Sequence, residues 1–152
     1  MLPNSDCIFC QIVEGKIPAT KLFEDDSAIA ILDINPITFG HSLYIAKEHY
    51  ATLLDVPEGE LGAIIKNLQK VVSVLLKATG CQGFNIIQNN TRCAGQLVPH
   101  MHFHLVPRKP NDPIRFNWQI QPYQKEQSQK LAEAIMASLA SGREKIKKAL
   151  GK

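Results

Sequence analysis

The stretch that decides the fold of this 152-residue chain is Val98-Pro99-His100-Met101-His102-Phe103-His104-Leu105-Val106-Pro107. Three of the chain's five histidines lie here, and an apolar residue separates each from the next. Strict alternation of this kind is typical of a β-strand, whose side chains point to opposite faces in turn. Because a strand rises about 3.3 to 3.4 Å per residue, same-face imidazoles stand about 6.5 to 7 Å apart. At that spacing three rings can serve one small ligand.

Plainer interpretations of the three histidines stay open at this point, namely satisfied core or surface residues and a bare metal patch. A row of imidazoles on a half-buried strand would give up hydrogen-bonding capacity without a packing gain, which disfavours a purely structural role. Just upstream, Gly95-Gln96 and the segment Asn89-Asn90-Thr91-Arg92 offer amide and backbone donors. Such donors suit an anionic ligand, so the sequence predicts an anion-binding site beside the histidines.

The run from His100 to Val106 resembles the signature of the histidine triad (HIT) family, His-x-His-x-His with apolar residues between and after. This family comprises nucleotide hydrolases and transferases. Further segments that match the family's order and spacing are Asp33-Ile34-Asn35-Pro36, Gly40-His41, Lys47-Glu48-His49, Asn89 and Gly95-Gln96. The resemblance covers about residues 6 to 108. Within the family, the chain resembles the bacterial-type branch, which carries an N-terminal Cys-x-x-Cys zinc site.

Length and composition describe an ordinary globular chain. With 45% hydrophobic and 20% charged residues, it fits one domain that buries about two-thirds of its unfolded surface. Its 17 basic and 14 acidic side chains leave a net charge of +3, too small to indicate nucleic-acid binding. The N-terminus lacks the basic start and apolar core of a secretion signal, and the longest apolar-rich run, Val71 to Leu76, is too short for a bilayer span. We therefore expect a cytoplasmic protein without a membrane partner.

Two of the four cysteines form a Cys-x-x-Cys pair, Cys7-Ile8-Phe9-Cys10. In a reducing compartment such a pair more often binds metal or performs redox chemistry than forms a disulfide. Metal binding is favoured, because a thioredoxin-like pair begins a long helix whereas Gly15 and Pro18 interrupt this segment. A redox protein that uses this pair stays open as a further function class.

The hydrophobic pattern predicts an α+β fold with a five-stranded and mainly antiparallel sheet, and the resemblance implies that this fold is HIT-like. A short N-terminal helix, one long helix from Pro57 to a stop at Gly80, and an amphipathic helix from about Lys125 accompany the sheet. The predicted strands are residues 21–23, 28–32, 42–46, 84–88 and the histidine strand.

We expect residues 1–110 to form the histidine triad nucleotide-binding domain. Residues 111–152 would form a C-terminal extension that packs on this domain or flanks it. The charged end of the extension, Arg143 to Lys148, is interpreted as a solvated helix face, with an anion-binding patch as the alternative.

The resemblance implies a covalent mechanism centred on His102. This residue would be the nucleophile that is nucleotidylated on the α-phosphorus. Histidine is competent for the task, because the intermediate divides one hard displacement into two easier ones. His100 and His104 complete the predicted catalytic set. The positions implied to bind the phosphate are His104, Asn89, Gly95 and Gln96, with Gly95 allowing close backbone approach.

The resemblance also implies a purine nucleotide as substrate. Asp33 would hold the ribose hydroxyls, although a carboxylate directly after a strand and before Pro36 equally fits an Asx-type turn. An apolar slot would hold the base with little base-specific hydrogen bonding. The residues implied to line this slot are Phe9, Ile12, Ile31 and Ile34.

Structural zinc is the implied cofactor. A closed tetrahedral site needs four ligands, and Cys7 and Cys10 supply two. In relatives that keep the Cys-x-x-Cys pair, the others are the His after the third strand and the first His of the triad, here His49 and His100. The cysteine half is visible locally, whereas the histidine half rests on the resemblance.

One position departs from the family pattern. Branches that act on phosphoramidates and diadenosine polyphosphates usually have Ser or Thr after the Gly-Gln pair, where this chain has Leu97. The substrate branch is therefore open. His104 favours hydrolysis, because transferase relatives have Gln at that place.

The resemblance thus predicts a hydrolase of purine nucleoside phosphoramidates or dinucleoside polyphosphates that acts at the α-phosphate. A homodimer formed through the long helix and an edge strand is implied with it. The alternative is a zinc-stabilised protein that binds purine nucleotides or acts as a scaffold, with little turnover.

Overall fold

The computed structural model describes residues 5–149, with the side chains of residues 5–141. The chain divides into two compact units, Met1–Ile114 and Arg115–Lys152. Within the described residues, no helix is both long enough and apolar enough to cross a membrane.

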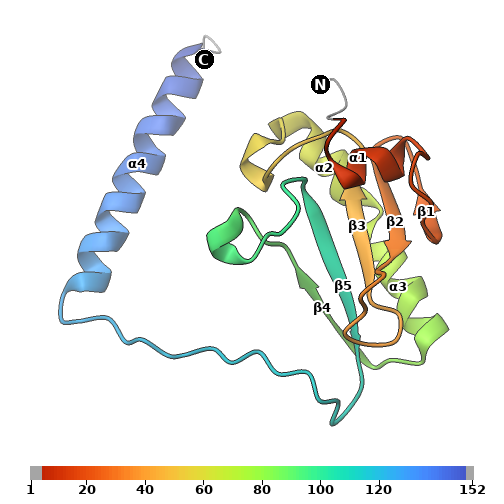
Figure 1. Ribbon diagram of the computed structural model, residues 1–152. Helices are drawn as coiled ribbons and strands as arrows, with labels where there is room; N and C mark the ends of the chain where they lie inside the picture. Colours follow the sequence, from red (N-terminus) through yellow and green to blue (C-terminus); the bar gives the residue numbers. More distant parts are fainter. Residues whose placement is uncertain (1–4, 150–152) are drawn as a thin grey trace. The chain divides into compact units, whose positions relative to one another are not determined.

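The first unit is built on a five-stranded sheet in which all neighbouring strands are antiparallel (Figure 1). The strand order is β1-β2-β3-β5-β4, which places the histidine strand inside the sheet. The strands are β1 (Lys21–Glu24), β2 (Ala28–Leu32), β3 (Ser42–Ala46), β4 (Gly83–Ile87) and β5 (His102–Arg108). The accompanying helices are α1 (Ile8–Val13), α2 (Glu58–Lys66) and α3 (Leu68–Thr79), with short 3-10 turns η1 (Leu53–Asp55) and η2 (Arg92–Ala94). The predicted α+β class is confirmed.

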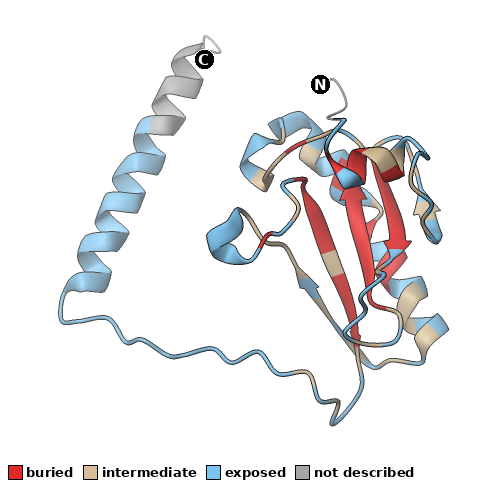
Figure 2. Ribbon diagram, viewed as in Figure 1, coloured by how far each residue is buried: buried red, intermediate tan, exposed pale blue. Residues whose placement is uncertain are grey.

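The two faces of the sheet carry different apolar cores, because side chains alternate along each strand. One face packs against α2 and α3 around the fully buried Tyr44 and Leu105. The other face packs against α1. The β3–β5 register opposes Ile45 to His102 and Leu43 to His104, so these two histidines share the α1 face. Figure 2 shows that buried residues lie mainly along β2, β3 and β5.

The long helix expected between Pro57 and Gly80 consists of two consecutive helices that meet at Asn67. The backbone of Asn67 has ψ near −4°, which interrupts the α-helical ladder. Its side chain donates to Asp25 Oδ2 at 2.7 Å, a contact with a loop far along the sequence. The apolar stripe continues across the break, so both helices still bury one face. Gly80 ends α3 in the left-handed conformation, as predicted.

The histidine strand begins later than the alternation of the sequence predicts. β5 starts at His102, whereas His100 lies in the turn before it. The turn is closed by a bond from the His100 amide to the Val98 carbonyl. The alternation in the sequence therefore begins two residues before the paired strand begins.

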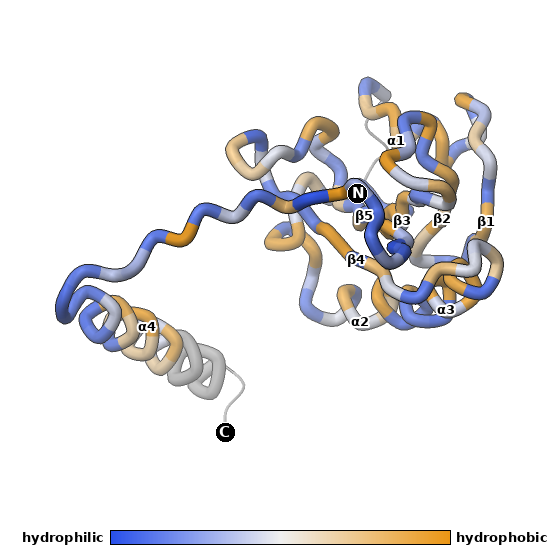
Figure 3. The backbone as a smooth tube through the Cα atoms, turned by 90° about the horizontal axis from the view of Figure 1, so that it is seen from below, coloured by the Kyte–Doolittle hydropathy of each residue, from blue (hydrophilic) through white to orange (hydrophobic). Residues whose placement is uncertain are grey.

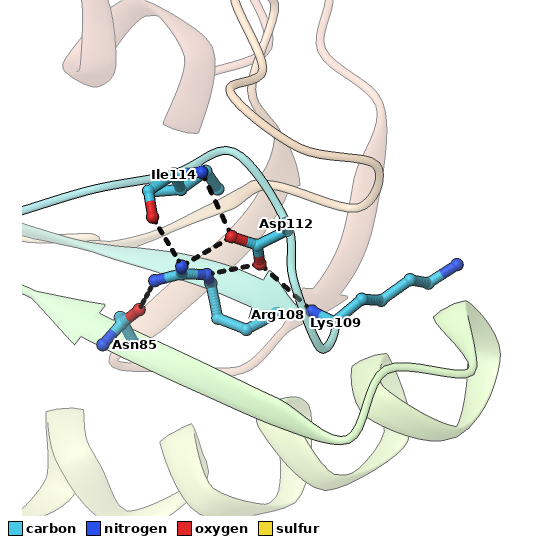
Figure 4. A network of polar contacts seen from close by, with 5 residues as sticks. All are labelled: Asn85, Arg108, Lys109, Asp112 and Ile114. Carbon is cyan, nitrogen blue, oxygen red and sulfur yellow. Dashed lines mark hydrogen bonds and ion pairs between the residues drawn. The ribbon is translucent and has the colours of Figure 1, made fainter.

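Arg108 fixes the end of β5 through a compact polar network (Figure 4). Its guanidinium donates to both carboxylate oxygens of Asp112, at 2.7 and 2.6 Å, which is a bidentate pair. It also donates to Asn85 Oδ1 on β4 at 2.6 Å and to the Ile114 carbonyl at 2.9 Å. The turn that follows the sheet is thereby attached to the last two strands.

The second unit contains α4 (Gln127–Ala149), which confirms the predicted C-terminal helix. Residues 115–126 before it are mostly irregular. Figure 3 shows both polar and apolar positions along the coloured part of α4, and the apolar side chains of Leu131, Ile135 and Leu139 are exposed. The side chains of the charged stretch Arg143 to Lys148 lie outside the described residues.

Candidate functional site

A cluster of two thiols and two imidazoles joins three separate parts of the first unit. Cys7 and Cys10 come from the start of α1, His49 from the segment after β3, and His100 from the turn before β5. Their potential ligand atoms all lie within 4.8 Å of one another. Two sulfurs and two imidazole nitrogens form a donor set suited to tetrahedral zinc, so these residues fit the predicted ion.

His100 offers the cluster a defined ring nitrogen. Its Nε2 donates to the Ala46 carbonyl at 2.7 Å, so the neutral ring carries its lone pair on Nδ1. That nitrogen lies 3.3 Å from Cys7 Sγ and 3.6 Å from Cys10 Sγ. Burial lowers the pKa of His100 to about 4, which keeps the ring neutral. The two ring nitrogens of His100 therefore face the Ala46 carbonyl and the cysteine sulfurs, and not His102 or His104.

His49 completes the cluster, with its Nδ1 at 3.3 Å from Cys10 Sγ. All four residues that were predicted as zinc ligands thus come together, although they span most of the first unit's sequence. The two rings of His49 and His100 meet edge to face at a centroid distance of 5.0 Å.

His102 presents a free nitrogen of known identity. Its Nδ1 donates to the His100 carbonyl at 2.6 Å, since a carbonyl can only accept. The lone pair of the neutral ring is consequently on Nε2. Burial lowers the pKa of His102, so this lone pair is not protonated near neutrality. Phe9 packs edge-on against the ring at 5.0 Å and helps to fix its plane.

His104 belongs to a second polar cluster, together with His41 and Asp33. The His41 Nε2 and His104 Nδ1 atoms are 3.0 Å apart, and Asp33 Oδ2 lies 3.6 Å from the former and 4.0 Å from the latter. The Ile37 amide donates to His41 Nδ1 at 3.3 Å, which places the His41 proton on Nε2. That proton is donated to His104 Nδ1. The neutral His104 ring therefore carries its own proton on Nε2.

Burial and neighbouring rings keep the imidazoles of this second cluster uncharged. Burial, followed by the charges of His102 and His41, lowers the pKa of His104 to about 4. Burial also lowers the pKa of His41, against the opposing effect of Asp33. At neutral pH the cluster thus holds neutral imidazoles with fixed tautomers.

Sequence reasoning gave no role to His41, although it placed Gly40-His41 among the matching segments. The residue lies just before β3 and reaches His104 because Leu43, two positions later, is paired with His104 in the sheet. No local pattern marks it. The usable signal was that it is one of only five histidines: four lie in these two clusters, and the ring of the fifth, His102, lies 5.1 Å from that of His104.

Asp33 forms the Asx-type turn that the sequence offered for it, while its contact with ribose stays a prediction. Its Oδ1 accepts the Asn35 amide at 2.8 Å, which is an Asx-type turn. Its Oδ2 faces the imidazoles of His41 and His104. One carboxylate oxygen thus shapes the loop after β2 while the other reaches the histidine site.

The residues expected to line a base slot divide into two groups. Phe9, Ile12 and Ile31 are buried in the apolar cluster beneath α1, and Phe9 contacts both His100 and His102. Ile34 instead has 87% of its surface exposed. Three of the four therefore lie together beside the triad, whereas Ile34 projects from the loop after β2.

The residues expected to bind phosphate come from the loop between β4 and β5. Gln96 is buried: its Oε1 accepts the Thr91 amide at 2.6 Å and its Nε2 donates to the Ala51 carbonyl at 2.7 Å. Gly95 adopts φ +87°, which a residue with a Cβ rarely does. Asn89 lies beside it, and Leu97 is 86% exposed.

Comparison with known families supplies the decisive observation. The model of the HIT domain matches residues 14–111, which is most of the first unit. The chain belongs to the HIT family. The resemblance noted in the sequence is therefore confirmed.

Several curated relatives of this HIT protein carry enzymatic names. The adenosine 5'-monophosphoramidase of Schizosaccharomyces pombe is 39% identical over 135 residues, covering 88% of this chain and 98% of its own. An adenylylsulfatase of Arabidopsis thaliana is 44% identical over 109 residues, covering 72% of this chain but only 55% of its own length. The Arabidopsis protein thus has a large part without a counterpart here.

Solved structures share the fold of the HIT protein at substantial identity. A Streptococcus mutans protein has a TM-score of 0.84 and 38% identity, covering 90% of this chain and 87% of its own. A zinc-bound HIT family protein of Mycobacterium smegmatis has a TM-score of 0.69 and 35% identity, covering 90% and 97%. A zinc ion is thus known in a relative of the same fold.

Proposed function

We propose that this HIT protein hydrolyses purine nucleoside phosphoramidates or dinucleoside polyphosphates at the α-phosphorus through a covalent nucleotidyl-histidine intermediate on His102. The observation that carries the proposal is the tautomer of His102, whose Nδ1 proton is held by the His100 carbonyl. The unprotonated Nε2 is the form of histidine that attacks phosphorus. The enzymatic names of the S. pombe and Arabidopsis relatives support the same reaction class.

The first step forms one bond and breaks another. His102 Nε2 attacks the α-phosphorus, a P–N bond forms, and the bond from phosphorus to the leaving nitrogen or oxygen breaks. The leaving group takes its proton from water. The Nε2–H of His104, oriented by its bond from His41, donates a hydrogen bond to the charge that develops on the phosphate.

The second step restores the histidine. Water adds to phosphorus, the P–N bond breaks, and the nucleoside monophosphate departs while one proton of the water goes to solvent. Donors from the loop of residues 89–96 would hold the phosphate oxygens in both steps. Asp33 and the apolar residues Phe9, Ile12, Ile31 and Ile34 would hold the ribose and purine.

Zinc has a structural part in this proposal. Bound to Cys7, Cys10, His49 and His100, it would supply a cross-link between α1, the segment after β3 and the turn before β5. No chemical step passes through it. His100 would then act on the reaction through its carbonyl, which orients His102.

We further propose that the HIT protein is a homodimer joined at the edge of its sheet. β4 has a sheet neighbour on one side only, and its Phe84 and Ile86 side chains are 47% and 42% exposed. They line a groove of about 510 Å³ with apolar residues of α2 and α3, including Ile65, Leu68, Val72 and Leu76. A second copy of the same edge would both pair the strand and cover the groove, which is how exposed edges are commonly protected.

A substrate panel tests the proposed reaction. Purified protein would be given adenosine phosphoramidate, a diadenosine polyphosphate and adenosine monophosphate, and products would be separated by chromatography. Release of adenosine monophosphate from either of the first two supports the proposal. Leu97 has no hydroxyl to assist a poor leaving group, so we expect the better phosphate leaving group to react faster. Tight binding of adenosine monophosphate without turnover of any substrate would instead support the binding-protein alternative.

A further inference from the structure

The loop that precedes the histidine triad contains a residue in an unfavourable backbone conformation. This phosphate loop, residues 89–96, is exposed along most of its length. Thr91 has φ +67°, a left-handed conformation that is unfavourable for a β-branched residue. Such a residue keeps its conformation only when its surroundings impose it. The contacts around Thr91 therefore hold the loop in this conformation.

Two side chains of the phosphate loop fasten it to one short stretch of backbone. Asn90 Oδ1 accepts the Leu53 amide at 2.8 Å and is itself braced by Gln88 Nε2 at 3.0 Å. Gln96 donates to the Ala51 carbonyl at 2.7 Å and accepts the Thr91 amide at 2.6 Å. The bond that Gln96 accepts is therefore made at Thr91 itself, the residue with the unfavourable φ.

The stretch that receives these bonds also contains a residue of the thiol and imidazole cluster. We call residues 49–53 the bridging segment: it begins with His49, whose Nδ1 lies 3.3 Å from Cys10 Sγ. Its second residue, Tyr50, accepts the Met101 amide at 2.6 Å, next to His100 of the same cluster. Only one residue separates His49 from Ala51. A short path of chain and hydrogen bonds therefore joins His49 to the phosphate loop.

We propose that Asn90 and Gln96 are positioning residues that couple the metal cluster to the phosphate loop, so that metal binding at His49 orders the loop that receives the substrate phosphate. The coupling rests on the function proposed above insofar as it assigns the phosphate to this loop. A metal ion fixes the position of His49, the bridging segment follows, and the two side chains hold Asn89 and Gly95 in place. Because coupling between two sites is reciprocal, nucleotide binding must equally affect the metal site.

Cobalt-loaded protein provides a direct readout of this coupling. The visible absorption of Co²⁺ in a site of two sulfurs and two nitrogens reports the geometry of its ligands. Adding adenosine monophosphate should shift this spectrum in the wild-type protein. In Asn90→Leu, which has a similar volume but cannot accept the Leu53 amide, the shift should vanish. In Asn90→Asp, which keeps the accepting oxygen, the shift should remain.

The control for local destabilisation is Asp55→Ala. It removes the bonds that Asp55 accepts from the amide and hydroxyl of Thr52, within the bridging segment, and leaves the Asn90 and Gln96 bonds in place. The spectral shift should persist in this variant. Loss of the shift in Asp55→Ala as well as in Asn90→Leu would mean that general weakening of the segment is responsible, and would overturn the coupling.

Hydrogen exchange decides the question without any nucleotide. The amides of Leu53 and Thr91, which donate to the two positioning side chains, should exchange at least about fivefold more slowly in zinc-loaded than in zinc-free folded protein. Asn90→Leu should abolish most of that difference at Thr91. Equal exchange in both metal states would overturn the coupling. Failure to bind adenosine monophosphate would contradict the proposed function alone, since the exchange experiment still reports on the loop.

Discussion

At the scale of single residues, His41 illustrates how an unreactive side chain can set the chemistry of a reactive one. It accepts the Ile37 amide on Nδ1 and donates from Nε2 to His104, so it determines which nitrogen of His104 carries a proton. Without that bond both tautomers of His104 are open, and only one presents a donor from Nε2. The fixed tautomer removes a reorganisation that the transition state would otherwise require.

Replacing His41 should therefore slow the reaction without removing the nucleophile. We expect His41→Ala to lower kcat about 10- to 100-fold, the effect of losing a hydrogen bond to a charged group worth about 1.5 to 3 kcal/mol. KM should change much less, because the loop of residues 89–96 is untouched. Steady-state kinetics on the best substrate of the panel would check this. An unchanged kcat would show that His104 needs no orientation from His41.

The depressed pKa of His104 gives the protein's stability a predictable dependence on pH. A neutral histidine with a folded pKa of about 4 and an ordinary value of 6.5 binds fewer protons in the folded than in the unfolded state between those values. Its contribution to stability is complete above about pH 6.5 and is lost as pH falls towards 4. Denaturant melts of zinc-loaded protein should show this loss, and His104→Asn should show a smaller one. Equal slopes in both proteins would contradict the assignment.

At the scale of helices and strands, periodicity in the sequence identified the elements but not all of their limits. The sheet and the C-terminal helix were predicted because each carries a regular apolar pattern, and the short N-terminal helix was predicted with the HIT-like fold. The break at Asn67 was not, because its bond to Asp25 joins residues distant in sequence. The late start of β5 was not, because His100 turns towards two cysteines from the other end of the unit. Such contacts leave no local periodic signal.

The exposed edge strand β4 leads to a prediction about assembly. Ile86→Lys places a charge in the apolar groove of the proposed dimer contact, where it would lose hydration without finding a partner. We expect the wild-type protein to sediment as a dimer and this variant to sediment as a monomer at micromolar concentration. The control is Leu54→Lys, since Leu54 is 91% exposed and lies on η1 rather than at the β4 edge. A monomeric wild-type protein would contradict the dimer.

At the scale of the whole first unit, the cluster of two thiols and two imidazoles brings together α1, the segment after β3 and the turn before β5. α1 has six residues and no side-chain cap at its N-terminus, so it depends on tertiary contacts. Cys7 and Cys10 attach its beginning to His49 and His100. The four proposed zinc ligands were predicted from the cysteine spacing and the family resemblance, whereas their convergence is seen only in the fold.

Loss of a cysteine ligand should accordingly release metal and destabilise the unit. Purified wild-type protein should contain about one zinc per chain by elemental analysis. Cys10→Ser should contain much less, and its thermal midpoint should fall by more than about 5 °C, because metal-binding free energy contributes to folding. Cys81→Ser, a change at a cysteine outside the cluster, should affect neither quantity. Metal-free wild-type protein, purified reduced and without chelators, would contradict the zinc site.

The central claim is that His102 becomes covalently attached to the nucleotide, and trapping that intermediate tests it most directly. Protein mixed with substrate would be quenched within milliseconds in base, where the P–N bond survives, and digested for mass spectrometry. We predict one nucleoside monophosphate on the peptide that contains His102. His102→Ala should show no adduct and more than about a thousandfold lower turnover, while still binding adenosine monophosphate. An adduct on another residue, or turnover by His102→Ala at the wild-type rate, would contradict the account.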